Sequence, residues 1–235
     1  MADTPTPRAW RVVLEKIEQD LLDGTLTPGD HLAPERELAA TLGVGRSSVR
    51  EALRVLEVMG LIRTGTGSGP TSGAIIIATP AGGLAQFLRL QVAAQGFPID
   101  DVVETRLLLE AWAVSHLAER DDTDLTAVRA TLQALDATDL TREEFLALDA
   151  QFHTGLADAA GNQIVAATMN GLRSVIEGYV RTGAERIADW DEAARHLQEE
   201  HHHILDAIED RDAETARARV RAHITGYLAA TGLRG

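Results

Sequence analysis

The sequence predicts a mainly helical protein in two parts, an N-terminal winged helix-turn-helix domain and a C-terminal all-α bundle of six or seven helices. Apolar residues recur with the 3.6-residue period of amphipathic helices along most of the chain. A Gly-, Ser- and Thr-rich stretch at 64–73 and a β-branched run at 74–78 interrupt this period. We therefore expect a first domain at 1–78, a linker leading into a helix at 79–99, and a helical domain at 100–235.

Charge divides the chain at the same place. The 235 residues have a formal net charge of −14. Residues 1–78 carry 8 Lys+Arg against 10 Asp+Glu, whereas residues 79–235 carry 14 against 26. Taken alone, the total charge argues against a nucleic-acid partner, because phosphates repel an acidic surface. The uneven distribution removes that argument for the N-terminal part.

Composition excludes several classes of protein. The hydrophobic share of 45% and the charged share of 25% are those of a globular chain and argue against wholesale disorder. The absence of cysteine excludes disulfides, thiolate zinc sites and cysteine nucleophiles. No apolar run approaches the roughly 18 residues of a membrane span, and the N-terminus lacks the layout of a secretory signal. We expect a cytoplasmic protein with no membrane partner.

Three helices are expected before residue 60, and the second and third have the spacing of a helix-turn-helix. Ala39, Gly43 and Val49 are four and then six residues apart. Ala39 lets the two helices cross closely, Gly43 permits a left-handed turn residue, and Val49 packs the third helix onto the second. The expected helices span Ala9–Leu22, Glu35–Leu42 and Arg46–Met59.

Two short strands after these helices complete the winged helix. Leu61–Thr64 and Ala74–Ala78 can pair with each other as a two-stranded wing. The Gly-rich segment Thr64–Gly73, with the sequence TGTGSGPTSG, would form the tip of that wing.

The third helix carries side chains that could recognise DNA. Arg46 and Arg50 are i and i+4, so they share one face near the helix N-terminus, where such helices meet base edges. Ser47 and Ser48 in the first turn can donate hydroxyl or amide groups to phosphate. The alternative is a solvated arginine face on a structural helix. The turn spacing and the wing favour DNA binding over that alternative.

The segment Asp30–Ile62 resembles the winged helix of GntR-family bacterial transcription regulators, through the motifs ERELA, LGV, VREALR and GLI. The resemblance implies a sequence-specific regulator that binds a double-stranded DNA operator. Pro34 and Gly45 depart from the family pattern, which usually has Ser or Thr at both places, and the wing is longer and less basic than usual. The implied DNA contacts are Arg36, Arg46 and Arg50, with Thr66 and Gly67 at the wing tip entering the minor groove.

The C-terminal part reads as a run of amphipathic helices with short turns between several of them. Six or seven antiparallel helices with little strand favour a bundle, whose interior is a common place for metal and ligand sites. The expected helices span Asp100–Arg120, Leu125–Ala137, Arg142–Ala159, Gln163–Gly183, Glu185–Glu209 and Ala213–Thr231.

An aspartate and three histidines form a candidate metal site. Asp149 and His153 are i and i+4 on an inward helix face, a spacing that suits two ligands of one cation. His201 opens a run of three histidines, of which at most one shares the ligand face. The apolar positions after it favour His201, although His202 also lies three residues before the apolar Leu205. With His223 on the last helix, the set suits Zn²⁺, Ni²⁺ or Mn²⁺. The alternative is a buried Asp–His pair with solvated histidines elsewhere.

Short segments of the C-terminal part resemble FCD, the all-helical ligand-binding domain of the FadR-type GntR subfamily. They are Val102–Glu119, the Asp149-x-x-x-His153 pair followed by AAGN, and the motifs EHHHILDAI and RVRAHI. The resemblance implies that metal-binding members use the residues that match Asp149, His153, His201 and His223.

Two further residues are candidates for effector binding. The resemblance implies that Arg106 meets the carboxylate of an effector, although a surface or structural arginine is the alternative. Asn162 follows the AAG turn and could line the pocket or cap the next helix.

These observations predict a one-component regulator, most often a repressor in this family. Two winged helices of a homodimer would dock on a two-fold symmetric operator. A small organic or sugar acid would bind beside the metal in the helical domain and change DNA affinity. Two alternatives stay open. One is a metal-dependent hydrolase or other enzyme that uses the Asp/His₃ site. The other is a metal-free sensor of an acyl or organic effector.

Overall fold

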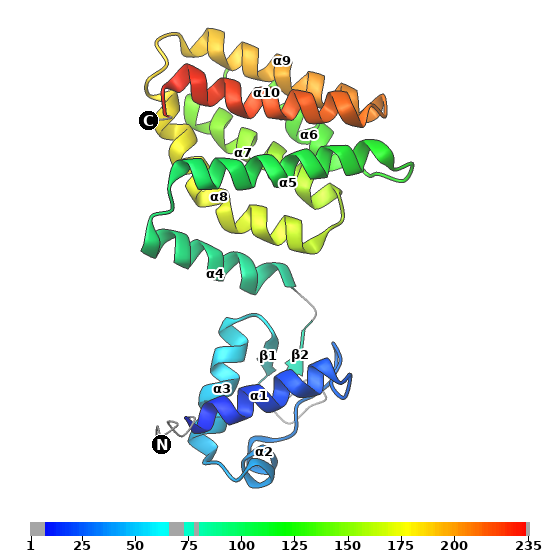
Figure 1. Ribbon diagram of the computed structural model, residues 1–235, viewed down its shortest axis with the longest axis vertical. Coiled ribbons are helices and arrows are strands. Elements are labelled where there is room, and N and C mark those ends of the chain that lie inside the picture. Colours follow the sequence, from blue (N-terminus) through cyan, green and yellow to red (C-terminus); the bar gives the residue numbers. More distant parts are fainter. Residues whose placement is uncertain (1–7, 66–72, 78–79, 234–235) are drawn as a thin grey trace, which may run out of the picture. The chain divides into compact units, whose positions relative to one another are not determined.

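The computed structural model describes residues 8–65, 73–77 and 80–233 (Figure 1). The chain separates into two compact units, Met1–Leu84 and Ala85–Gly235. Within the described residues the structure has ten helices and one two-stranded sheet, which confirms the predicted mainly helical fold class. No described helix has the length and apolar character needed to cross a membrane.

The N-terminal unit contains the predicted helix-turn-helix. Helix α1 spans Ala9–Leu22, α2 spans Glu35–Leu42 and α3 spans Arg46–Val58. Gly43 ends α2 with φ 64°, in the left-handed region that glycine adopts without a steric penalty. Gly45 precedes α3 with an extended backbone, so the chain turns between the two helices within three residues.

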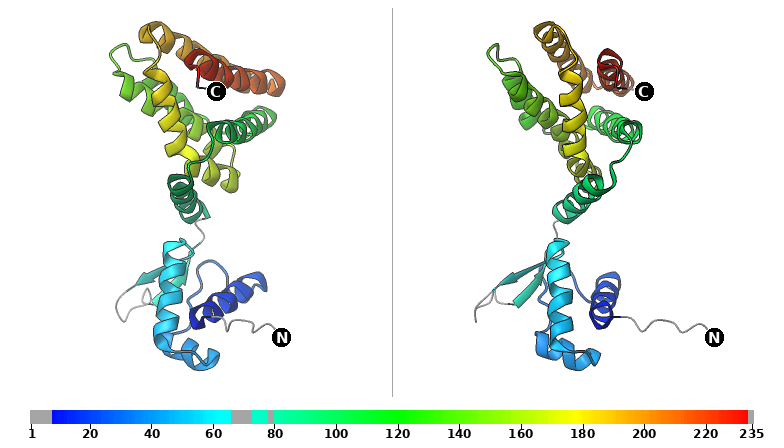
Figure 2. Two further views of the ribbon diagram at one scale, coloured as in Figure 1. Left: turned by 60° about the vertical axis from the view of Figure 1, so that its left-hand side comes forward. Right: turned by 90° about the vertical axis from the view of Figure 1, so that its left-hand side faces the viewer.

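The wing follows α3. Strand β1, Ile62–Gly65, pairs antiparallel with β2, Gly73–Ile76, and Ile62 lies opposite Ile76. Both of these isoleucines are buried and join a core under α1 and α3 that includes Val13 and Val49. Figure 2 shows the strands lying beside α3. The predicted wing-tip residues Thr66 and Gly67 lie outside the described residues.

A helix occupies most of the segment that the sequence analysis assigned to a linker. Helix α4 spans Pro80–Gln95. Proline is favoured at the first position of a helix, because its missing N–H would have no intrahelical partner there. Beyond Gly83 the segment has no helix breaker before Gly96, and it is rich in Ala, Leu and Gln. The sequence analysis expected a linker leading into a helix here, and the described helix begins at Pro80.

Six helices form the C-terminal bundle, in agreement with the predicted number. The expected helix Glu185–Glu209 is shorter than predicted. Asp189 caps it at residue 190, where the Asp189 side chain accepts a hydrogen bond from the Glu192 amide at 3.0 Å. The helices are α5 Ile99–Glu119, α6 Thr126–Leu135, α7 Arg142–Ala159, α8 Gln163–Ala184, α9 Trp190–Glu209 and α10 Ala213–Thr231.

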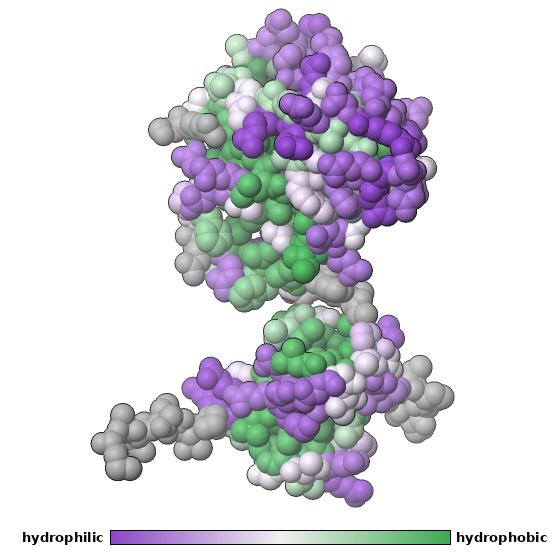
Figure 3. Space-filling view, turned by 45° about the vertical axis from the view of Figure 1, so that its right-hand side comes forward, coloured by the Kyte–Doolittle hydropathy of each residue, from purple (hydrophilic) through white to green (hydrophobic). Residues whose placement is uncertain are grey.

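Helix α5 is the central element of this bundle. It packs against α7, α8, α9 and α10, and Figures 1 and 2 show it running beside α10. Its buried face contains two charged residues, Arg106 and Glu110, among apolar neighbours such as Val103 and Val114. On the face drawn in Figure 3, hydrophilic side chains cover much of the helical domain. Arg106 and Glu110 are therefore inside the domain, whereas hydrophilic side chains gather on the face drawn.

Candidate functional site

The bundle interior brings together the four candidate metal ligands. Asp149 and His153 project from α7, His201 from α9 and His223 from α10. One ligand atom from each residue lies within 4.8 Å of the others, and all four side chains are buried. Metal–ligand bonds of about 2.0–2.2 Å place donor atoms within about 4.4 Å of one another, so small side-chain shifts would bring all four onto one ion.

Two glutamates orient the histidines. Glu110 Oε2 lies 2.6 Å from His153 Nδ1, and Glu200 Oε2 lies 2.8 Å from His223 Nδ1. Burial opposes the charge of Glu110, but Arg106 and His153 outweigh it and lower the Glu110 pKa to about 2. An ionised carboxylate only accepts hydrogen bonds, so each Nδ1 must donate. This fixes both rings with their Nε2 lone pairs turned away from the glutamates.

In their neutral forms, the rings of His153 and His223 make a repulsive contact that a cation or a proton would relieve. His153 Nε2 and His223 Nε2 face each other at 3.1 Å. With both Nδ1 atoms protonated, each Nε2 carries a lone pair, and two lone pairs at this distance repel unless a cation or proton lies between them. Carboxylate–histidine pairs of this type commonly support metal-bound imidazoles.

His201 supports the same assignment. Its side chain is fully buried, and neither ring nitrogen has a hydrogen-bond partner among the described residues. His201 Nε2 nevertheless lies 3.2 Å from Asp149 Oδ1. Burial lowers the pKa of His201 to about 4, which keeps the ring neutral and able to bind a metal at neutral pH. A metal bound by Asp149 and His201 together would give the buried Nε2 atom a partner.

Asp149 adds the negative charge that a cation would balance. Burial opposes ionisation, but His201 and His153 nearby outweigh it, and the pKa of Asp149 lies below its usual value. The carboxylate is therefore an anion in a buried site where burial also holds the pKa of His153 and of His201 below its usual value. An uncompensated buried charge is costly. The donor set of one carboxylate and three imidazoles fits Zn²⁺, Ni²⁺ or Mn²⁺.

Arg106 is joined to this cluster through Glu110. Arg106 Nε donates to Glu110 Oε1 at 2.5 Å, and Nη1 donates to the Tyr179 hydroxyl at 2.8 Å. Burial works against the guanidinium charge, but the charge of Glu110 raises the pKa of Arg106 overall. A continuous chain of contacts therefore runs from Tyr179 through Arg106 and Glu110 to His153.

The sequence analysis did not identify the supporting roles of Glu110, Glu200 and Tyr179. Glu110 had a detectable signal, because it follows Arg106 by four residues on the inward face of a helix. The contact between Glu200 and His223 joins two different helices, and no spacing rule within one helix predicts it.

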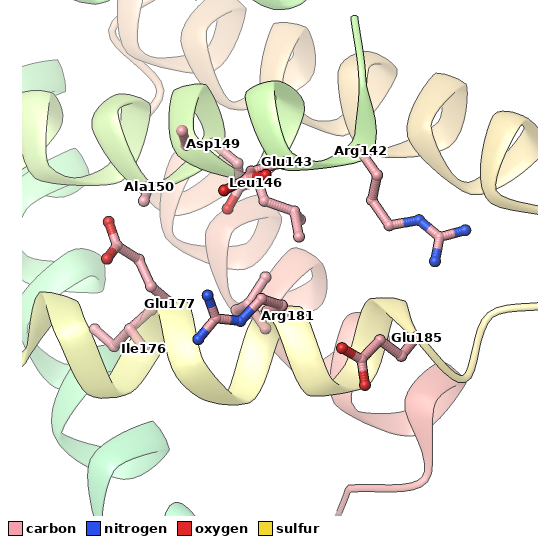
Figure 4. A pocket seen from close by; sticks show the side chains of 11 residues that line it. Arg142, Glu143, Leu146, Asp149, Ala150, Ile176, Glu177, Arg181 and Glu185 are labelled. Carbon is pink, nitrogen blue, oxygen red and sulfur yellow. The ribbon is translucent and has the colours of Figure 1, made fainter.

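A pocket of about 570 Å³ opens between α7 and α8, next to the cluster of four candidate metal ligands (Figure 4). Asp149 belongs both to the cluster and to the wall of the pocket. Charged side chains of both signs, including Arg181 and Glu177 on α8, surround an apolar interior. The lining residues are Arg142, Glu143, Leu146, Ala147, Asp149, Ala150, Ile176, Glu177, Val180, Arg181 and Glu185.

The two predicted effector contacts do not line this pocket. The guanidinium of Arg106 is paired with Glu110 and Tyr179 instead. Asn162 is exposed at the start of α8, where its Oδ1 accepts hydrogen bonds from the amides of Ile164 and Val165. Of the two roles left open for Asn162, the structure has the helix cap.

The candidate DNA-contact residues lie at the surface of the N-terminal unit. Arg46 and Ser47 are exposed and Ser48 is half-buried, all in the first turn of α3. Arg36 is exposed on α2. Arg50 is exposed as well, and its Nη2 donates to Glu35 Oε2 at 2.9 Å.

The protein combines a winged helix that has an exposed arginine face with a helical domain that holds a buried cluster of candidate metal ligands. This combination is typical of DNA-binding transcription regulators with a sensor domain. Residues 11–71 match the family described as bacterial regulatory proteins, gntR family, and residues 101–226 match the FCD domain. The chain belongs to the GntR family, in its FadR-type subfamily. The resemblance inferred from the sequence is confirmed, and the enzyme alternative is set aside.

Named relatives agree with this assignment. The HTH-type transcriptional regulator LutR of Bacillus subtilis is 30% identical over 208 residues, covering 86% of this chain and 92% of LutR. The HTH-type transcriptional repressor NanR of Klebsiella aerogenes is 32% identical over 237 residues, covering 93% of this chain and 83% of NanR. The solved structure of Streptococcus agalactiae GntR has the same fold, with a TM-score of 0.57 at 23% identity, covering 93% and 98% of the two chains.

Proposed function

We propose that this regulator is a homodimeric repressor whose DNA affinity is controlled by a carboxylate effector bound beside a divalent metal. The observation that carries the proposal is the position of Asp149. It is at once one of the four clustered metal-type ligands and part of the wall of the 570 Å³ pocket. A ligand in that pocket would therefore reach the metal cluster directly. The DNA partner would place the protein in the cytoplasm.

The four clustered residues would hold the metal. Asp149, His153, His201 and His223 supply one carboxylate and three imidazoles. When bound, Zn²⁺, Ni²⁺ or Mn²⁺ would supply a positive centre for a carboxylate or hydroxyl oxygen of the effector. Glu110 and Glu200 keep the imidazoles of His153 and His223 oriented.

The remainder of the pocket favours a small organic acid with an apolar portion. Leu146, Ile176 and Val180 provide apolar wall, and Arg181 and Arg142 provide cations that can meet an anionic group. A volume of 570 Å³ lies within the range typical of small-molecule sites, about 300–1,000 Å³. Arg106 would act on the four candidate ligands indirectly, through its contact with Glu110. A direct contact between Arg106 and the effector stays a prediction.

DNA recognition would use the exposed face of the winged helix. Arg46 and Arg50 would contact base edges, with Arg36, Ser47 and Ser48 on bases or phosphates. Effector binding between α7 and α8 would change the separation or freedom of the two winged helices in the dimer. Such a coupling is typically about 1–3 kcal/mol, which changes operator affinity by about 5- to 150-fold.

Three linked measurements on protein purified without a histidine tag test the proposal. Elemental analysis should find one equivalent of a divalent metal per chain. A thermal-shift screen of organic and sugar acids should give hits that need the metal, and a hit should release the protein from its operator in a gel-shift titration. Operator release by an effector that binds equally well after metal removal would favour the metal-free sensor instead.

A further inference from the structure

An acidic side chain lies among the residues proposed to contact DNA. Glu35, the first residue of α2, forms a two-point ion pair with Arg50 of α3. Arg50 Nη2 lies 2.9 Å from Glu35 Oε2, and Arg50 Nε lies 3.4 Å from Oε1. The hydrogen bond from Arg50 is the largest cause that lowers the pKa of Glu35, so the carboxylate is charged at neutral pH.

Neither the stability of the fold nor the attraction of the protein to DNA explains the Glu35–Arg50 ion pair. The two side chains are 57% and 37% exposed, and exposed ion pairs of this kind contribute little to stability. A carboxylate close to a DNA-binding face also repels phosphate. The Glu35 charge therefore lowers the affinity for DNA of any sequence. Sequence selectivity is the property that the pair could still improve.

The geometry of the pair indicates how it could improve selectivity. A guanidinium has five N–H donors in a planar fork. Glu35 occupies the edge formed by Nε and one hydrogen of Nη2. The end formed by Nη1 and the other hydrogen of Nη2 is left as two parallel donors, which match the O6 and N7 acceptors of guanine.

We propose that Glu35 is a positioning residue for sequence recognition by Arg50. It holds the guanidinium with its Nη1/Nη2 end toward a guanine of the operator. Its charge also reduces the tendency of Arg50 to bind phosphate at other sequences. The inference rests on the DNA-contact role proposed for Arg50, and it adds the residue that gives this contact its base selectivity.

The test compares Glu35→Gln with Glu37→Gln in the full-length protein. Both substitutions remove one negative charge from the first turn of α2, so Glu37→Gln is the control for charge alone. The probes are a duplex selected from a randomised pool by the wild-type protein and a duplex of scrambled sequence. Each guanine of the selected duplex is replaced in turn by 7-deazaguanine, which lacks the N7 acceptor.

In the wild type, 7-deazaguanine should weaken binding at the guanine that Arg50 contacts in each half-site, and Arg50→Ala should remove the sensitivity at that position. Glu35→Gln should shrink the same sensitivity and lower the ratio of selected to scrambled affinity by about tenfold. Its affinity for scrambled DNA should rise, with a salt dependence steeper by about one phosphate contact. Glu37→Gln should leave the ratio unchanged.

Several results would overturn the inference, and they separate its failure from that of the proposed function. If Glu35→Gln and Glu37→Gln raise the affinity for the selected and the scrambled duplex by the same factor, Glu35 acts only through its negative charge. Loss of discrimination at a cytosine would mean that Glu35 contacts a base itself. Unchanged sequence selectivity in Arg50→Ala would remove the role of Arg50, and failure of the wild type to select any sequence would remove the proposed function as well.

Discussion

The two domains of this regulator use arginine in opposite ways. In the winged helix, Arg46 and Arg50 lie exposed on one helical face. In the helical domain, Arg106 is only 4% exposed and is bound to Glu110 and Tyr179. A surface arginine can be removed with little effect on folding, whereas removal of a buried one leaves an uncompensated charge. Substitution of Arg46 or Arg50 should therefore change function alone, and substitution of Arg106 should change stability and function together.

The largest expected effect is loss of the metal in His153→Ala. The substitution removes one ligand and leaves Glu110 Oε2 without its histidine partner. Elemental analysis should find metal well below one equivalent, and the effector response should disappear while apo DNA binding stays. His203→Ala, an exposed neighbour of His201, is the control and should retain the metal. Full metal content in His153→Ala would contradict the four-ligand assignment.

The next effect is on folding. Arg106→Met breaks a buried ion pair, which typically costs about 3–5 kcal/mol because the partner charge stays buried. Arg129→Met breaks the exposed pair with Glu209 in the same domain and should cost at most about 1 kcal/mol. Urea unfolding followed by the fluorescence of Trp112 and Trp190, both in the helical domain, measures the two costs. Similar losses of stability in the two variants would mean that burial does not decide how much each arginine stabilises the fold.

Arg46→Ala tests the surface side of the comparison. Loss of a bidentate contact with guanine costs about 1–3 kcal/mol per site, and the proposed homodimer would make the contact twice. Gel-shift titration should therefore show no specific retardation, while the unfolding midpoint and the mass in solution stay as in the wild type. Arg11→Ala removes an exposed arginine from α1 and serves as the control. Retained specific binding in Arg46→Ala would refute the assignment of α3 as the recognition helix.

Helix bounds were predicted about equally well in the two domains. Helices α1 and α2 of the winged helix have the expected bounds, with glycines such as Gly24 and Gly43 near their ends, and so do α7 and α10 of the bundle. The four metal-type ligands were chosen from spacing and resemblance, and the fold brings them together. Their supporting shell was not predicted. The contacts of Glu110 with His153 and of Glu200 with His223 depend on how α5, α7, α9 and α10 cross, and periodicity within one helix carries no such information.

The smallest predicted effect separates capping from ligand binding in Asn162→Ala. Loss of the two hydrogen bonds to the amides of α8 should cost about 1 kcal/mol of stability, the usual value for an N-cap. Asp212→Ala removes the equivalent cap of α10 and should cost a similar amount. Because Asn162 does not line the pocket, the affinity for an effector should be the same in both variants, as measured by calorimetry. A loss of effector affinity in Asn162→Ala alone would assign this residue to the ligand site as well, and would place that site nearer the start of α8 than the pocket in Figure 4.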